Sequence, residues 1–252
     1  MGRAPALLAA LLLGAALGLY YAFHEQLWSA STWWDIAFVS LLLIPACFAF
    51  VWLALPLRDL PGLLLVGVGF GAAALLCHLA GWNTLENFSK LFGVTAIGFW
   101  FLRYFESLAW IVLVALIIPW VDAYSVWRGP TKVIVTEHRE VFTNFSFAFP
   151  LPGETAAANL GLPDLLFFAL FLAAAARWAL RPGLTWLLLT LSFGATLALA
   201  VWRDIGGLPA LPLLALGFLA SNADLLWTRV RQELQEARSG RTETRSSGRS
   251  EP

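Results

Sequence analysis

Charged residues are scarce in this sequence. Only 13% of its 252 residues are Asp, Glu, Lys or Arg, whereas 60% are hydrophobic and the mean hydropathy is +0.74. Soluble domains typically carry about 25% charged and about 45–50% apolar residues. This shortage of charge excludes a soluble globular enzyme, a disordered chain and a nucleic-acid-binding protein.

Cysteine and histidine are also rare. The two cysteines, Cys47 and Cys77, lie inside apolar runs, which excludes a disulfide scaffold and a cysteine-rich metal site. The three histidines form no His-Glu-x-x-His motif, and Ser192 and Ser221 have no histidine partner at matching depth. No P-loop or dinucleotide fingerprint occurs either, so we expect no metal and no cofactor.

Long hydrophobic runs are what the sequence has in abundance. A helix needs roughly 20 apolar residues to cross a hydrocarbon core of about 30 Å. Eight segments qualify: residues 5–23, 34–56, 61–81, 88–103, 107–127, 160–180, 183–203 and 207–227. The predicted fold is therefore an all-α polytopic membrane bundle of about eight transmembrane helices.

The spans are predicted to form two regions followed by a tail. About four helices lie within residues 1–103, and a second transmembrane half covers residues 104–228 with an outer loop at 128–159. The tail, residues 229–252, begins with a helical pattern and ends in Ser, Gly, Arg and Glu, which predicts disorder.

The outer loop contains a stretch rich in β-branched and aromatic residues. From residue 141 its apolar residues partly alternate with polar ones, so residues 133–149 predict a strand, with a hairpin turn near 138–139. An interfacial aromatic loop is the alternative interpretation. Pro150 and the residues after it are expected to break the pattern.

The basic residues predict the orientation. The side that holds both termini carries eleven arginines, five in the spans and loops and six in the tail, against five basic residues on the other side. By the positive-inside rule, both termini face the cytoplasm. Arginine outnumbers lysine fourteen to two, which is typical of a high-GC bacterial coding style and indicates a multi-pass protein of a bacterial plasma membrane.

Two carboxylates stand out because ionisable groups inside a membrane are costly and usually functional. Asp35, Asp59 and Glu106 lie at span ends, where water reaches them easily. At 1.5 Å per residue, by contrast, Asp122 lies about 7 Å and Asp164 about 6 Å inside the outer ends of consecutive antiparallel spans. The two acids are therefore expected at the same depth.

The last span begins at the same level with irregular backbone. Gly206, Gly207, Pro209 and Pro212 would leave backbone groups unpaired there. Such backbone is tolerated at membrane depth only where it is buried or lines a water-filled cavity. The start of the last span is thus predicted to lie beside the two acids.

Paired carboxylates suit one kind of chemistry. Two carboxylates in close contact share a proton, because both cannot ionise cheaply. The ionised partner can then take a proton from water while the protonated partner donates to a scissile carbonyl oxygen, as in aspartic proteases. Two separate buried acids with local partners, or an ion or proton relay, are the alternatives.

These segments resemble the presenilin and signal peptide peptidase family of intramembrane aspartyl proteases. That family carries Tyr-Asp, Gly-x-Gly-Asp and Pro-Ala-Leu motifs on three of its last four spans. The corresponding segments here are Val121-Asp122, Gly161-Leu162-Pro163-Asp164 and Pro209-Ala210-Leu211. The resemblance covers residues 117–222, and the family usually has nine spans.

The resemblance implies a presenilin-like bundle of the microbial type. It makes Asp122 and Asp164 the catalytic pair and places the substrate against the other residues of the motifs. Those residues are Gly161, Leu162, Pro163, Pro209, Ala210 and Leu211, together with Tyr124. Two positions depart from the family pattern: Val121 replaces the tyrosine, with Tyr124 one turn away, and Pro163 replaces the second glycine.

The predicted function is cleavage of transmembrane segments or remnant signal peptides by the two aspartates and water. The expected partners are transmembrane peptide or protein substrates and the lipid bilayer, with no nucleic acid. Pro163 favours one alternative, a family member that binds transmembrane helices without cutting them. An unrelated proton-coupled carrier is the other.

Two further groups of residues are expected to serve the fold. Gly67, Gly69 and Gly71 permit close helix contact. Asn222 and Asp224 lie in the last span, far from Asp122, and are predicted to make packing contacts or interhelical hydrogen bonds.

Overall fold

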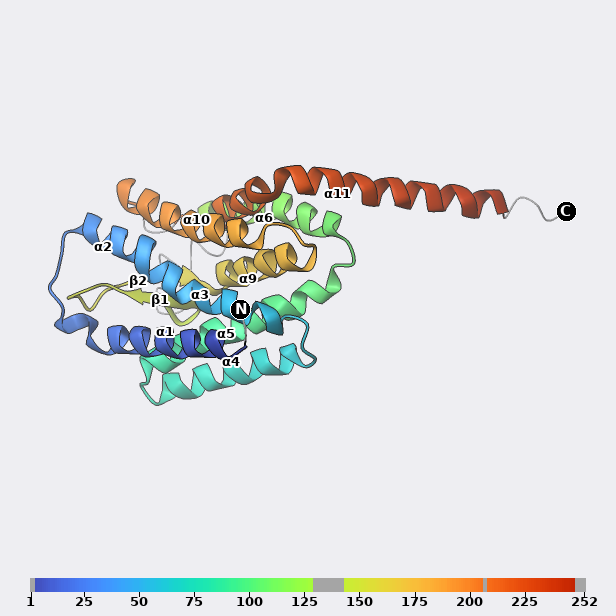
Figure 1. Cartoon of the computed structure of the whole chain (residues 1–252). Helices are drawn as coiled ribbons and strands as arrows, with labels where there is room; N and C mark the ends of the chain where they lie inside the picture. The colour runs from blue at the N-terminus through green and yellow to red at the C-terminus, as the bar shows by residue number, and fades with distance from the viewer. Residues whose placement is uncertain (1–2, 129–142, 206–207, 248–252) are drawn as a thin grey trace.

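The computed structural model describes residues 3–128, 143–205 and 208–247 (Figure 1). Its helices are α1 (Arg3–Phe23), α2 (Thr32–Phe38), α3 (Ile44–Ala54), α4 (Leu63–Leu79), α5 (Asn83–Phe101), α6 (Leu108–Arg128), α9 (Leu162–Arg177), α10 (Pro182–Trp202) and α11 (Leu211–Ser247). Its strands are β1 (Ser146–Pro150) and β2 (Ala157–Gly161). A π-helical segment, Val39–Leu43, joins α2 and α3 without a break.

Helices occupy all eight predicted segments, which confirms an all-α membrane bundle. Among the described residues, five helical stretches are long and apolar enough to cross a bilayer. They are Leu8–Gln26, Thr32–Leu57, Leu108–Val126, Pro182–Trp202 and Leu211–Glu233. The larger count of eight stays a prediction.

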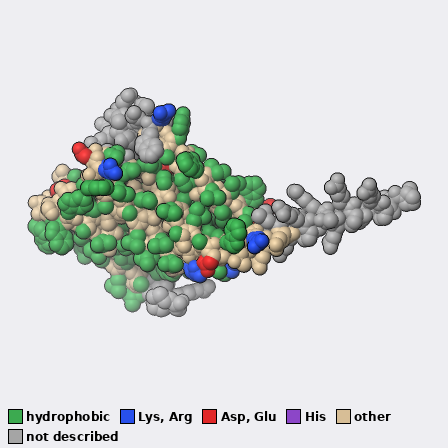
Figure 2. Space-filling view, turned by 90° about the horizontal axis from the view of Figure 1, so that it is seen from above, with side chains coloured by type: hydrophobic (Ala, Val, Ile, Leu, Met, Phe, Trp, Pro, Cys, Tyr) green, Lys and Arg blue, Asp and Glu red, His purple; other side chains and the backbone are tan. Residues whose placement is uncertain are grey.

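The outside of the bundle is apolar. Figure 2 shows hydrophobic side chains over most of the visible face, with the coloured charged groups near its margins. Leu11, Leu65 and Trp120 are each more than two-thirds exposed. Such exposure of large apolar side chains suits a surface that contacts lipid rather than water.

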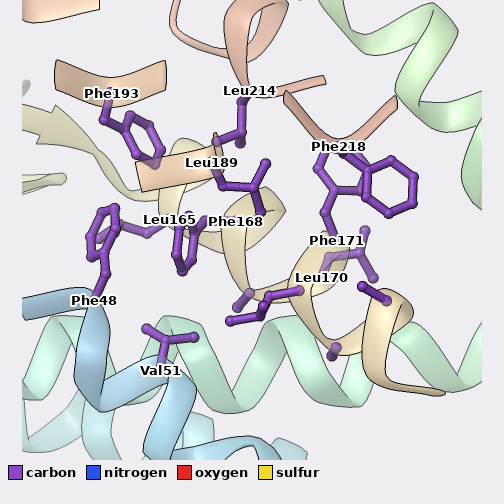
Figure 3. Packing of buried hydrophobic residues seen from close by; sticks show 14 of the residues in the cluster. Phe48, Val51, Leu165, Phe168, Leu170, Phe171, Leu189, Phe193, Leu214 and Phe218 are labelled. Atoms are coloured by element: carbon purple, nitrogen blue, oxygen red, sulfur yellow. The ribbon is translucent and has the colours of Figure 1, made fainter. Parts of the chain in front are cut away.

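Helix α9 forms the centre of the bundle. Every side chain from Phe168 to Ala175 is fully buried, and α9 packs against α5, α10 and α11. Its phenylalanines meet Phe48 of α3 and Phe218 of α11 (Figure 3). The rings of Phe171 and Phe218 stack with centroids 4.8 Å apart. Since lipid gives helices no hydrophobic drive to associate, this close packing holds the bundle together.

Small residues bring α4 and α5 into close contact, as predicted for Gly67. An added Cβ at Gly67 would lie 2.5 Å from Cγ1 of Ile97 and 3.1 Å from the carbonyl oxygen of Gly93. Added Cβ atoms at Gly69 and Gly71 would meet nothing within 4 Å. Gly67 therefore sets the helix distance, whereas Gly69 and Gly71 leave open space.

The strand prediction is right in part. β1 and β2 form an antiparallel hairpin in which Ser146 pairs with Gly161. Pro150, which was expected to break the strand pattern, is the last residue of β1. The turn of the hairpin lies at residues 151–156. The turn predicted near residues 138–139, and the strand prediction from 133 to 142, lie outside the described residues.

No pattern in the sequence indicates β2. This strand is built from small residues of low β-propensity, so nothing in its composition separated it from the helix predicted to begin at residue 160. The structure ends β2 at Gly161 and begins α9 at Leu162. A strand thus leads directly into the helix that carries Asp164.

The predicted disorder of the tail is wrong as far as Ser247. α11 continues without interruption from Leu211 to Ser247 and extends well beyond the rest of the bundle (Figure 1). Residues 231–238 read Arg-Gln-Glu-Leu-Gln-Glu-Ala-Arg, all of high helix propensity, and extend a helix already begun.

We expect the α5–α9 contact to tolerate no added methyl group at Gly98. A Cβ there would lie 2.9 Å from the carbonyl oxygen of Leu166 and 3.0 Å from Cβ of Ala169. Gly98→Ala should therefore destabilise the protein by about 1–3 kcal/mol, the usual cost of overpacking. Thermal unfolding in detergent measures the change, with Gly69→Ala as the control in open space. Equal stability of the two variants would contradict the prediction.

Candidate active site

Asp122 joins α6 to the start of α11. Its Oδ2 accepts a hydrogen bond of 3.1 Å from the backbone N–H of Leu211, the first residue of α11. The first N–H groups of a helix have no partner within the helix, and their partial positive charge favours an anion. The carboxylate of Asp122 thus lies where the start of α11 offers a free N–H group and a partial positive charge.

Asp164 lies in the first turn of α9. Gly161 is the N-cap residue and Pro163 stands in the first turn, where a proline costs no hydrogen bond. Asp164 accepts a hydrogen bond from the backbone of Gly161, in the manner of a capping box. An added Cβ at Gly161 would lie 3.0 Å from Oδ2 of Asp164, so glycine leaves room for this carboxylate.

The two acids are brought together, although they come from different helices. Asp122 is close enough to act electrostatically on Asp164. Both side chains are partly buried. Each is anchored to a backbone N–H at a helix start, so the orientation of both carboxylates is fixed by main chain.

The other residues of the three motifs surround this pair to different extents. Pro209, Ala210 and Leu211 are buried, and Leu211 contacts Asp122 directly. Leu162 is partly buried and donates its N–H to the carbonyl oxygen of Phe145. Pro163 is exposed beside Asp164. Gly206 and Gly207 lie outside the described residues.

The structure does not bring Tyr124 to the acids. Val121 is 53% exposed and Tyr124 is 67% exposed. The two side chains lie on the same face of α6, since residues three apart are neighbours on a helix surface. Residue 124 is two positions from Asp122 and points to a different face. The expected replacement of the family tyrosine by Tyr124 is therefore not supported.

The outer edge of β2 lies next to Asp164 and is occupied in part, since Gly161 is bonded to Asp164 and Nδ2 of Asn159 donates to the carbonyl oxygen of Ala157 at 3.3 Å. Ala148 of β1 has its N–H and C=O bonded to side chains on the side away from β2. Since Ala148 pairs with Asn159, this is a non-hydrogen-bonded pair, and the backbone groups of Asn159 point away from β1 as well. In the described part of the chain, no backbone group of another segment bonds to this edge of β2 at Asn159.

Asp35 is a buried acid that the sequence interpretation misplaced. It was expected to be hydrated at a span end, but it is only 4% exposed in the first turn of α2. Its Oδ1 has no hydrogen-bond partner within the described residues. The sequence carried no signal of this burial, because the residues that cover Asp35 belong to other helices.

Glu233 makes a second connection between α6 and α11. Its carboxylate oxygens accept hydrogen bonds of 3.1 Å from the backbone N–H groups of Leu108 and Ala109, at the start of α6. Each helix of this antiparallel pair thus caps the other with a carboxylate. Sequence reasoning missed Glu233 because it had been assigned to a solvated tail.

Asn222 makes the interhelical hydrogen bonds predicted for it. Its Oδ1 accepts from the backbone N–H of Arg181 and its Nδ2 donates to Oγ1 of Thr185. Asp224 forms two hydrogen bonds with Arg181, at 2.7 and 2.6 Å, which raise the pKa of that guanidinium. These contacts join α10 to α11.

No protein-family model matches the chain, and no curated protein is found to be similar to it.

We expect Glu233→Ala to weaken the bundle without touching the two aspartates. Loss of the carboxylate leaves the N–H groups of Leu108 and Ala109 without their acceptor, which typically costs about 0.5–2 kcal/mol. Thermal unfolding followed by circular dichroism measures the loss. The control is Glu106→Ala, an exposed acid just before the same helix, which should leave stability unchanged. A stability equal to wild type for Glu233→Ala would show that the cap contributes nothing.

Proposed function

We propose that the chain is an intramembrane aspartyl protease of the presenilin and signal peptide peptidase type. The observation that carries this proposal is the meeting of Asp122 and Asp164 beside Leu211, the last residue of the Pro-Ala-Leu segment. All three sequence features that resembled the family are in or next to this one site. Such a set of residues on three helices is what a membrane-embedded aspartic dyad requires.

The chemistry follows from the pairing of the carboxylates. Each has one hydrogen bond from a backbone N–H, which holds the pair in place and leaves the remaining oxygens to share a proton. The ionised partner takes a proton from a water molecule as that water attacks the scissile carbonyl carbon. The protonated partner donates its proton to the carbonyl oxygen, and a tetrahedral diol results. Its collapse releases the amine and the carboxyl products.

The substrate in this proposal is a transmembrane segment or a remnant signal peptide. A helix hides its peptide bonds from a protease, so the substrate must become extended near the acids. The edge of β2 at Asn159 offers an N–H and a C=O to an extended chain, and β2 leads directly into α9, which carries Asp164. The outer edge of β1, by contrast, is occupied by the side chain of Asn87 at Ala148.

The basic residues support the predicted orientation. Guanidinium groups of Arg103, Arg177 and Arg229 donate to the carbonyl oxygens of Leu60, Leu102 and Trp178, in the loops at the end of the bundle away from the hairpin. By the positive-inside rule, that end and both termini face the cytoplasm of a bacterial plasma membrane. The two aspartates then lie toward the outer side.

The carrier alternative has less support. A proton-coupled carrier needs titratable groups along its path through the membrane. From Phe168 to Ala175 the buried face of α9 is entirely apolar. The two aspartates therefore sit at one level and do not belong to a polar path along this helix. The helix-binding alternative rests on Pro163, whose exposed ring stands beside Asp164.

Replacing either acid by its amide should abolish cleavage. In liposomes with fluorogenic transmembrane peptides, we expect Asp122→Asn and Asp164→Asn each to lower the rate at least about a thousandfold, or about 4 kcal/mol. A transition-state-mimicking aspartyl protease inhibitor should block the wild type. Asp59→Asn, an exposed acid paired with Arg58, is the matched control and should keep full activity. No cleavage by wild type together with no inhibitor binding would remove the proposal.

Pro163→Gly tests whether the proline restricts catalysis. Glycine at this position would let the substrate backbone approach Asp164 closely. We expect kcat/KM to rise about three- to tenfold, equivalent to about 0.7–1.4 kcal/mol in the barrier. Pro182→Gly, at the start of α10 and away from the acids, should not change it. Cleavage by Pro163→Gly but not by wild type would instead favour the helix-binding alternative.

A further inference from the structure

The outer edge of β1 is closed by an amide side chain rather than by another strand. Oδ1 of Asn87 accepts a hydrogen bond of 2.8 Å from the N–H of Ala148, and Nδ2 of Asn87 donates to the C=O of Ala148, also at 2.8 Å. A residue of a neighbouring strand makes the same pair of bonds. Asn87, which is buried in α5, thus takes the place of a third strand.

Two tyrosines of α1 complete the closure. The hydroxyl of Tyr21 donates to the C=O of Ala148 at 2.8 Å, and that of Tyr20 donates to the C=O of Pro150 at 2.6 Å. A carbonyl oxygen accepts two hydrogen bonds, so Asn87 and Tyr21 together saturate Ala148. No extended chain can add to β1 at this point while these side chains remain.

The tip of the hairpin is held as well. The N–H of Gly153 donates to the carbonyl oxygen of His24 at 2.7 Å. Gly153 has a φ of +70°, and an added Cβ would lie 2.4 Å from the backbone nitrogen of Ser29, so only glycine fits. The hairpin is therefore bound along one edge and at its turn by the N-terminal part of the chain.

The orientation of Asn87 is supported by side-chain contacts of its neighbour Glu86. Glu86 is buried and bonds Nζ of Lys90 at 2.6 Å and Nδ1 of His78 at 3.1 Å. The contact with His78 crosses from α5 to α4. This cluster holds the first two turns of α5 in one rotation about the helix axis, with Asn87 toward β1.

Movement of β1 would be transmitted to the candidate dyad. β1 and β2 are joined in a fixed register from Ser146–Gly161 to Pro150–Ala157. Gly161 is both the last residue of β2 and the N-cap to which Asp164 is hydrogen-bonded. A shift of the strand pair therefore changes the position of this carboxylate.

We propose that Asn87, with Tyr21, is a positioning residue for the cleavage reaction. It closes the outer edge of β1, so that an extended substrate pairs only with the edge of β2 beside Asp164, and it holds that strand in register. The proposal rests on the protease function proposed above. It gives a specific task to the N-terminal half, in which the sequence showed no chemical motif.

The test combines the cut position with amide hydrogen exchange. Asn87→Leu removes both bonds to Ala148. We expect the backbone amide hydrogen of Ala148 to exchange about tenfold faster, the size expected for a lost hydrogen bond. In liposomes, kcat should fall about tenfold and mass spectrometry should find cuts at additional positions along the peptide. Asn83→Leu, an exposed position one turn earlier in α5, is the matched control and should match wild type.

Tyr21→Phe keeps the proposal testable if Asn87→Leu does not fold. It removes one hydroxyl and leaves both bonds from Asn87 to Ala148, so cuts at additional positions should appear at a lower level. If wild type cleaves no peptide, the protease function fails and this proposal fails with it. If wild type cleaves, while Asn87→Leu and Tyr21→Phe keep its cut positions and rate, only the positioning role is overturned. Unchanged exchange at Ala148 in Asn87→Leu would overturn it independently of activity.

Discussion

The arrangement of this bundle depends on carboxylates that bind the starts of helices. A helix that begins at membrane depth must find partners for its first N–H groups, because lipid supplies none. Asp122 bonds the start of α11, and Glu233 bonds the start of α6. Asp164 bonds the N-cap of its own helix. The acids assigned to chemistry are therefore also acids that the fold needs.

The depth of each acid is set by packing of a different kind. Asp164 is placed by α9, whose close contact with α5 at Gly98 leaves no room for sliding. Asp122 is placed by the antiparallel pair of α6 and α11, joined at both ends by carboxylate bonds. Van der Waals contact and capping thus act together, where a soluble protein would use the hydrophobic effect. As a result, acids from two separate helices meet at one level.

The sequence predicted the features that are local and missed those that depend on distant partners. Apolar runs gave the helices, and acids inside those runs gave Asp122 and Asp164, because a charge within a hydrophobic segment is visible without a structure. Neither Asn87 nor Glu233 shows in the sequence what it binds, since their partners lie in other segments of the chain. β2 was missed because its small residues favour no strand, and the burial of Asp35 depends on helices that cover it.

The two edges of the hairpin differ in how their backbone groups are satisfied. An unpaired N–H or C=O at membrane depth costs several kcal/mol, so a two-stranded sheet with both edges open would be expensive. Here the edge of β1 is satisfied by Asn87 and the tyrosines of α1. In the proposed reaction, a transmembrane substrate that unwinds for cleavage exposes the same kind of unpaired groups. Pairing them with the edge of β2 satisfies both chains at once, and it does so next to Asp164. In the proposed reaction, closing the edge of β1 thus leaves the edge of β2 at Asn159 as the side on which an unwound substrate pairs.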